Sequence, residues 1–278
     1  MKKFWLLFAA LTVLLLAACS GEEEATSSSE EKKVIKVGFG VGTYEEAFRE
    51  SIQPILEEKG YEVEIEVFSQ NTQVNPAMIE DAIDASIFQS TAYMKDMNSE
   101  LGGKMTGIAY VPSAPQGLYS VNHKSLDEVK DGMTVGLPND PVNQERAVRI
   151  LEELGWVTIE GEARASNFNI NQVVAAEYEL DFKILDPAQI LVSLQDLDFG
   201  VVNGNYIANA EDYTFLDALQ LENTPLEHRI IVAINEEDKD TQWAKDLVAA
   251  YESATFEDYI LAQDKYQGFV LPDAWQNN

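Results

Sequence analysis

A short segment near the middle of the chain brings a carboxylate, amides and a guanidinium together. Residues Leu137–Arg146 read Leu-Pro-Asn-Asp-Pro-Val-Asn-Gln-Glu-Arg. Asn139 or Asp140 can cap a helix, and Pro141 suits its first position because the missing N–H would be unpaired there. The segment therefore predicts a helix start, where free N–H groups and a partial positive charge favour an anion.

Asn143 and Arg146 lie about one helical turn apart in this segment, so they share a helix face. A guanidinium can hold a carboxylate through two parallel hydrogen bonds, and a neighbouring amide can orient the rest of a ligand. A surface arginine paired with Glu145 or Glu153 explains the same pattern equally well. The local sequence leaves both interpretations open.

The N-terminus predicts a second kind of chemistry, lipid attachment. Lys2 and Lys3 precede the apolar stretch Phe4–Ala18, and small residues lead to Cys19, the one cysteine of the chain. This stretch is shorter than the roughly 20 apolar residues of a spanning helix, so it indicates a lipoprotein signal peptide with Cys19 as the lipidated residue. The alternative is an ordinary secretory signal with a chance cysteine. Residues Ser20–Lys33 are rich in Glu and Ser and predict a flexible tether.

Composition excludes several other functions. Lys and Arg number 19 against 48 Asp and Glu, for a formal charge of −29. Such a surface repels phosphate backbones and anionic lipids, so we expect no nucleic-acid partner and contact with the membrane through the lipid anchor alone. The two histidines lack zinc-site spacing and the cysteine is used for lipid, so we expect no metal and no cofactor.

Hydrophobic periodicity predicts alternating strands and helices. Continuous apolar runs or alternation indicate strands, and helical spacing ending at a glycine indicates helices. The predicted strands are Val34–Phe39, Tyr61–Val67, Ala85–Phe88, Met133–Leu137, Phe199–Val202 and Ile230–Ile234. The predicted helices run over about 44–56, from about Pro76, and over Thr91–Leu101, Val142–Leu154, Thr241–Ser253 and Phe256–Tyr266. Repeated βα units imply an α/β fold with parallel sheets flanked by helices.

A lipid-tethered α/β chain outside the cell suggests a two-lobed solute-binding protein that closes over its ligand like a hinge. The chain is expected to cross between lobes near Tyr119–Ser125 and to return near Pro225–Arg229. This division assigns residues 34–122 and 229–278 to lobe one and residues 123–228 to lobe two. The ligand is expected in the cleft between the lobes.

From Lys33 to the C-terminus the chain resembles the NlpA-type, methionine-binding lipoprotein family, the substrate-binding components of methionine ABC importers. Five stretches in the family's order carry the resemblance: Ile83–Ala85 with Phe88-Gln89, Gly117–Ser120, Lys124–Glu128, Pro138–Pro141 with Asn143 and Arg146, and Val202–Tyr206. In that family the ligand carboxylate is held at the positions of Arg146, Asn143 and Asn203. Aromatic residues at the positions of Phe88 and Tyr93 flank the ligand side chain.

Three positions depart from the family pattern. Methionine binders have Asp-Tyr where this chain has Gln70-Asn71, a histidine where it has Ser90, and an asparagine where it has His228. The first two changes remove rings and should make the side-chain end of the pocket larger and more polar. His228 is either a structural substitute or a ligand contact sensitive to pH.

The resemblance implies a lipid-anchored, extracellular or periplasmic solute-binding protein and not an enzyme. The expected ligand is methionine, a related amino acid or a short peptide, and the expected partner is an ABC importer permease, with the protein itself a monomer. A surface adhesin with a vestigial pocket is the alternative, and a tethered enzyme is a weaker one, because no nucleophile–histidine motif is present.

Overall fold

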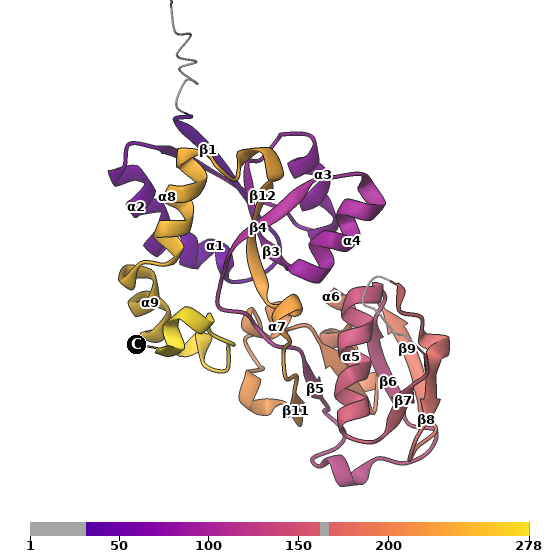
Figure 1. The fold of residues 1–278 in the computed structure, drawn as a ribbon. Coiled ribbons are helices and arrows are strands. Elements are labelled where there is room, and N and C mark those ends of the chain that lie inside the picture. Colours follow the sequence, from indigo (N-terminus) through magenta and orange to yellow (C-terminus); the bar gives the residue numbers. More distant parts are fainter. Residues whose placement is uncertain (1–31, 162–166, 278) are drawn as a thin grey trace, which may run out of the picture. The chain divides into compact units, whose positions relative to one another are not determined.

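Two five-stranded β-sheets organise the chain (Figure 1). The computed structural model describes residues 32–161 and 167–277. The first sheet has the order β2-β1-β3-β12-β4, with β1 Val34–Phe39, β2 Glu62–Val67, β3 Ala85–Ser90, β4 Met105–Tyr110 and β12 Ile230–Asn235. The second has the order β11-β5-β10-β6-β9, with β5 Gly117–Tyr119, β6 Thr134–Pro138, β9 Asp181–Leu185, β10 Phe199–Val202 and β11 Gln220–Leu221. Strands β7 Val157–Ile159 and β8 Val173–Ala175 pair separately.

Helices cover both faces of each five-stranded sheet. They are α1 Tyr44–Ala47, α2 Gln53–Glu58, α3 Val74–Ile79, α4 Thr91–Leu101, α5 Pro141–Glu153, α6 Pro187–Ser193, α7 Gly204–Ala208, α8 Gln242–Tyr251 and α9 Ala254–Leu261. A π-helical turn, Phe48–Ile52, joins α1 to α2. The predicted α/β fold, with two sheets flanked by helices, is confirmed.

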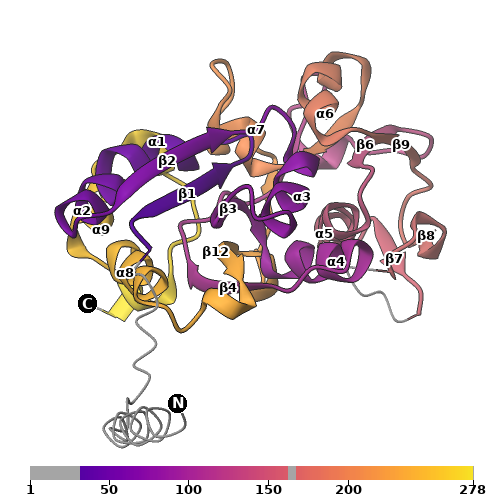
Figure 2. The same ribbon diagram turned by 90° about the horizontal axis from the view of Figure 1, so that it is seen from above.

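The first sheet separates two apolar clusters. On one face, Ile35 and Val37 of β1 pack in a cluster that also contains residues of the π-turn, α2, α8 and α9. On the other, Met78 of α3 and Met94 of α4 pack with residues of β3, β4 and β12. Figures 1 and 2 show α2 and α8 on one side of this sheet and α3 and α4 on the opposite side. The burial of both faces explains the nearly continuous apolar sequence of β1.

The second sheet packs against α5 on one face and α6 on the other. The apolar residues of α5 join a cluster with β6 and β10. On the opposite face, Gly136 and Gly200 are paired in register. A Cβ at Gly136 would lie 2.6 Å from Leu197 Cδ1, and one at Gly200 would lie 2.7 Å from Leu194 Cδ2. The two glycines therefore admit α6 and the turn after it close to the sheet.

The expected parallel sheets are in fact mixed sheets. In the first sheet β12 runs antiparallel to β3 and β4, and in the second β5 runs antiparallel to β10 and β11. The remaining pairs in both sheets are parallel. A βα crossover joins two parallel strands of one sheet. Strands β5 and β12 are not reached by such a crossover, because the chain enters β5 from the first sheet and enters β12 from the second.

The chain changes sheet twice. The first change lies between Tyr110 and Gly117, ahead of the expected Tyr119–Ser125, because β5 is already paired within the second sheet. The second lies between Leu221 and Ile230, the stretch that contains the expected return. The lobe boundaries after residues 122 and 228 stay a prediction, since residues 32–278 form one compact unit by their contacts.

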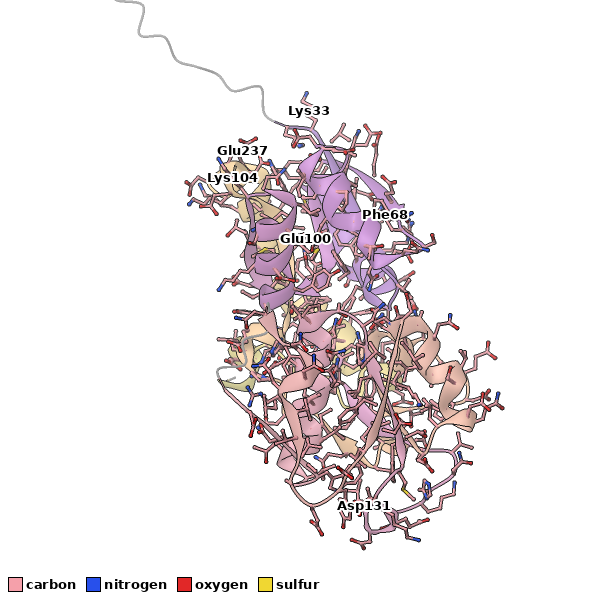
Figure 3. All side chains as sticks on the ribbon, turned by 90° about the vertical axis from the view of Figure 1, so that its right-hand side faces the viewer. Lys33, Phe68, Glu100, Lys104, Asp131 and Glu237 are labelled. Carbon is pink, nitrogen blue, oxygen red and sulfur yellow. The ribbon has the colours of Figure 1, made fainter. Side chains whose placement is uncertain are left out.

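Acidic side chains are spread over the outside of this unit. Glu100, Asp131 and Glu237 are all exposed and lie on different elements (Figure 3). Within the described ranges, no helix is long and apolar enough to cross a membrane. The predicted signal peptide, Cys19 and the tether up to residue 31 lie outside the described residues.

Candidate functional site

A cavity of about 520 Å³, here called the main cavity, lies where strands of both sheets end. Val41 follows β1, Ser90 ends β3, Asp140 follows β6, Asp186 follows β9 and Asn203 follows β10, and all five line the cavity. The carboxyl ends of parallel strands are where α/β folds place ligands, because loops and helix starts gather there. The topology therefore places residues from both sheets around one cavity.

Three of these residues also begin helices. The side chains of Ser90, Asp140 and Asp186 accept hydrogen bonds from backbone N–H groups in the first turns of α4, α5 and α6. Each cap satisfies an N–H group that has no partner within its own helix. The same bonds fix the side chains at the edge of the cavity. Of the two expected caps of α5, Asn139 and Asp140, Asp140 forms the cap, and the expected place of Pro141 at the first position is confirmed.

Arg146 lines the main cavity but forms a buried ion pair with Glu222. Its Nε lies 2.8 Å from Glu222 Oε1 and its Nη2 lies 2.6 Å from Glu222 Oε2. The two side chains are 8% and 5% exposed. Burial alone would raise the pKa of Glu222, but the guanidinium holds that pKa below its usual range. The alternative pairing of Arg146 with Glu145 or Glu153 is not formed; Glu145 binds Arg149 instead.

The guanidinium still has hydrogen-bonding capacity. Its Nη1 donates to Asn143 Oδ1 at 2.9 Å, so each of its three nitrogens uses one N–H group. Because each Nη nitrogen carries two N–H groups, one on Nη1 and one on Nη2 stay without a partner among the described residues. Arg146 can therefore bind an anion without giving up Glu222.

Gln116 holds this group together from a fully buried position. Its backbone N–H donates to Glu222 Oε2 at 3.1 Å. Its side-chain Nε2 donates to Asn203 Oδ1 at 2.8 Å and to the backbone oxygen of Asn143 at 3.2 Å. The backbone and side chain of this one residue thus fix the relative positions of Glu222 and of the two asparagines.

Aromatic rings form another part of the main cavity. Phe88 and Tyr93 meet edge to face with ring centroids 6.1 Å apart. Burial, with Asp140 the next cause, raises the pKa of Tyr93 to about 12. Burial also raises the pKa of Tyr206, with Asp186 the next cause. Both tyrosine hydroxyls are therefore neutral hydrogen-bonding groups, and aspartate carboxylates supply negative charge around them.

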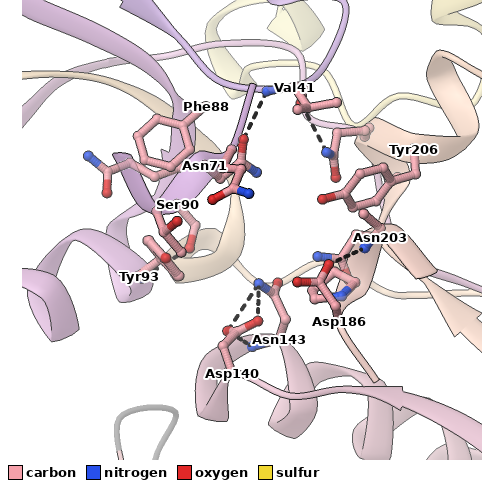
Figure 4. Close-up of a pocket in the computed structure, with 18 of the residues that line it drawn as sticks. Val41, Asn71, Phe88, Ser90, Tyr93, Asp140, Asn143, Asp186, Asn203 and Tyr206 are labelled. Atoms are coloured by element: carbon pink, nitrogen blue, oxygen red, sulfur yellow. Dashed lines mark hydrogen bonds between the residues drawn. The ribbon is translucent and has the colours of Figure 1, made fainter. Parts of the chain in front are cut away.

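Polar side chains lie beside these aromatic rings in the cavity. Asn71, in the position where methionine binders have tyrosine, accepts a hydrogen bond from the Val41 N–H at 2.8 Å. Asn205 from α7 donates to the Val41 oxygen at 2.9 Å, so the loop after β1 is tied to elements of both sheets. Figure 4 shows Asn71 and Ser90 facing Tyr206 across the open space.

The structure brings together all the predicted ligand residues except His228. The residues that line the main cavity are Arg146, Asn143, Asn203, Phe88, Tyr93, Asn71 and Ser90. His228 lies instead in the turn Leu226–His228 before β12, is 3% exposed and has its Nε2 3.5 Å from Glu145 Oε2. It lines a second cavity, of about 610 Å³, between α4 and α5. A direct ligand contact by His228 in the main cavity is thus not supported, because Glu145 lies on a different side of α5 from Asn143.

Sequence reasoning missed several residues of this site, and four of them matter most. Gln116 and Glu222 organise Arg146, while Asp186 and Tyr206 line the cavity. The sequence did indicate a role for Asp186 as a helix cap, because an Asp-Pro pair before an apolar run marks a helix start. The same pair marks the start of α5. Glu222 had none, since it lies 76 residues from Arg146. No group of side chains that could hold a metal ion occurs among the residues the structure describes.

Comparison with known proteins shows the family. The sequence model of the NlpA lipoprotein family matches residues 35–274. The chain belongs to the NlpA lipoprotein family. The matched residues run from the second residue of β1 to beyond α9, so they span both five-stranded sheets.

Individual relatives carry informative names. The methionine-binding lipoprotein MetQ of Bacillus subtilis is 28% identical over 224 residues, 79% of this chain and 81% of the relative. A nutrient-binding protein of Burkholderia cenocepacia, solved bound to methionine, is 30% identical with a TM-score of 0.79, covering 85% of this chain and 99% of that one. An ABC-transporter periplasmic substrate-binding protein of Coxiella burnetii is 28% identical with a TM-score of 0.78, covering 86% of this chain and 100% of that one.

Proposed function

We propose that this NlpA lipoprotein captures an amino acid or short peptide outside the cell and delivers it to an ABC importer. The observation that carries the proposal is the placement of Arg146 and Asn143, on the first turns of α5, at a cavity formed by both sheets. Two free guanidinium N–H groups beside an oriented amide suit an α-carboxylate. The methionine-binding relatives support the same class of ligand.

Cys19 would carry the lipid anchor, with the tether joining it to the folded unit that starts near Lys32. Two or three acyl chains anchor a protein stably, whereas one is marginal. We propose that the protein faces the extracellular side, or the periplasm where an outer membrane exists, and acts as a monomer.

Both alternative functions are less well supported. The two histidines do not supply a catalytic base to the main cavity, because neither lines it: His123 Nε2 lies 3.0 Å from Asp198, and His228 lies against Glu145. An adhesin with a vestigial pocket would have no need of a buried Arg146 that is held by Glu222 and Asn143 and keeps N–H groups unused by the described residues at a cavity. This arrangement therefore favours a working ligand site.

A thermal-shift panel of amino acids and dipeptides tests the proposal. A ligand that binds the folded state stabilises it by RT ln(1 + [L]/Kd), about 2.7 kcal/mol at a hundredfold excess over Kd. We expect at least one α-amino acid or dipeptide to raise the melting temperature. Mass spectrometry of small molecules released from the purified protein should identify the same compound. A panel without any shift, on protein first freed of bound ligand, would contradict ligand capture.

A further inference from the structure

The main cavity carries negative charge, whereas a site that binds only a carboxylate would need positive charge. Its charged lining residues are Asp140, Asp186 and Arg146. The Arg146 charge is already balanced by Glu222 behind it. The cavity and the residue behind it thus contain three carboxylates and one guanidinium, so the cavity has surplus negative charge.

The two lining carboxylates have no cationic partner of their own. Asp140 accepts hydrogen bonds from the backbone and side chain of Asn143, and Asp186 accepts one from the Ala188 N–H. Within the described part of the chain, neither forms a salt bridge with a lysine or arginine. Bringing both into contact with a ligand removes water from two charges, which costs free energy, and two cationic groups on the ligand would offset that cost.

The two carboxylates stand in different surroundings. Asp140 is close enough to Arg146 for the guanidinium to oppose the burial that raises the Asp140 pKa. A ligand whose carboxylate meets Arg146 would place its α-ammonium group beside Asp140. Asp186 caps a different helix, α6, and lies on the side of the cavity with Tyr206, opposite Phe88 (Figure 4). This leaves Asp186 for a second positive group.

Aromatic faces near these carboxylates add to the attraction for a cation. Phe88, Tyr93 and Tyr206 all line the same cavity. An ammonium or guanidinium group within about 6 Å of such a ring is attracted by the ring's quadrupole. Figure 4 shows Tyr206 and Asp186 on the side opposite Phe88, so a side-chain cation would lie between rings and carboxylate.

We propose that the main cavity selects an α-amino acid with a positively charged side chain, and that Asp186 recognises that side-chain charge. The proposal rests on the proposed function, since it specifies the ligand class of the same site. A neutral amino acid such as methionine satisfies Asp140 but leaves Asp186 without a partner. A basic amino acid satisfies both.

Calorimetric titration of matched ligand pairs tests this on the lipoprotein purified in detergent. L-arginine is compared with L-citrulline, and L-lysine with Nε-acetyl-lysine, because each pair has a similar shape and differs in side-chain charge. We expect the charged member of at least one pair to bind at least tenfold more tightly, with an affinity that falls as salt is added. Methionine should bind more weakly than the better basic ligand.

The variant Asp186→Asn tests the contribution of the Asp186 charge alone. Asparagine keeps the cap of α6 and removes the charge, so affinity for the basic ligand should fall about fivefold, the upper end for one exposed ion pair, while affinity for the neutral ligand is unchanged. Asp196→Asn is the control, because Asp196 is exposed near the end of the same helix, does not line the cavity and gives the same change in net charge.

Each of the remaining outcomes would contradict a different part of the inference. Equal or tighter binding of citrulline, acetyl-lysine or methionine would overturn the selection for charge and leave amino-acid capture standing. An equal loss in Asp186→Asn and Asp196→Asn would overturn the role of Asp186, since bulk charge would then explain the effect. If none of these amino acids binds while another amino acid or a dipeptide of the thermal-shift panel does, this inference fails and ligand capture stands; if nothing on that panel binds, both fail.

Discussion

Replacing Arg146 by methionine should reduce both stability and ligand affinity, for separable reasons. Arg146 and Glu222 are 8% and 5% exposed and share contacts of 2.8 and 2.6 Å. Removing one partner of such a pair leaves the other charge buried, which costs about 3–5 kcal/mol. In a fold of this size, each kcal/mol lowers the melting temperature by about 2–4 °C, so the expected drop is roughly 6–20 °C.

A double variant separates the two effects. Arg146→Met with Glu222→Gln removes both charges, and the glutamine oxygen can still accept from the Gln116 N–H and the Thr224 hydroxyl, as Glu222 Oε2 does. Replacing a buried ion pair by neutral groups of similar size is often neutral in stability. The double variant should therefore recover most of the lost stability. Affinity should stay at least tenfold below that of the unmodified protein, because the carboxylate grip is still missing.

Urea denaturation measures the stability of each variant, and calorimetry with the tightest ligand of the panel measures affinity. Arg149→Met is the matched control, since Arg149 lies on the same helix, is 44% exposed and pairs with Glu145 and Glu152 away from the main cavity. Its change in stability should stay within about 1 kcal/mol, and its affinity should not change. Full affinity in the double variant would refute the reasoning and leave Arg146 a purely structural residue.

Three further predictions concern other parts of the chain. Cys19→Ser should abolish incorporation of labelled fatty acid, and equal labelling of variant and unmodified protein would exclude Cys19 as the anchor. Asn71→Tyr with Ser90→His returns rings to the polar part of the cavity and should shift preference toward methionine in a titration; an unchanged ranking would show that other positions set specificity. The hydrogen bond to Asp198 raises the pKa of His123. A raised pKa stabilises the fold fully below the unfolded value of about 6.5, and this stabilisation is lost as pH rises through the folded-state pKa. Urea midpoints should therefore fall over that rise, and His123→Gln should flatten this fall.

Local chemistry made some elements predictable. The strand Val34–Phe39, the helix Thr91–Leu101 and the strand Phe199–Val202 have the expected bounds, because apolar patterning and turn residues define each of them within a few positions. The start of α5 was predictable for the same reason, since Asp140 and Pro141 specify it without help from distant residues.

Other elements depend on distant partners and left little local signal. Strands β5 and β11 are very short and are defined by pairing with each other and with β10, so periodicity has too few residues to detect them. His228 was expected near the ligand through the resemblance alone. Its burial against Glu145 depends on how the turn before β12 meets α5, which no single segment encodes.

The Arg146–Glu222 pair limits how any ligand can bind. A ligand carboxylate that displaced Glu222 would leave a side chain 5% exposed with an uncompensated charge, at a cost comparable to breaking the pair, about 3–5 kcal/mol. That cost is as large as a charge-assisted contact is worth, about 1.5–3 kcal/mol for each hydrogen bond. Sharing is therefore favoured, with the ligand using the free Nη1 and Nη2 donors while Glu222 keeps its contacts. A shared guanidinium attracts an anion less strongly than a free one, so the cationic end of the ligand must contribute more of the binding energy. The carboxylates at the starts of α5 and α6 are placed to supply it.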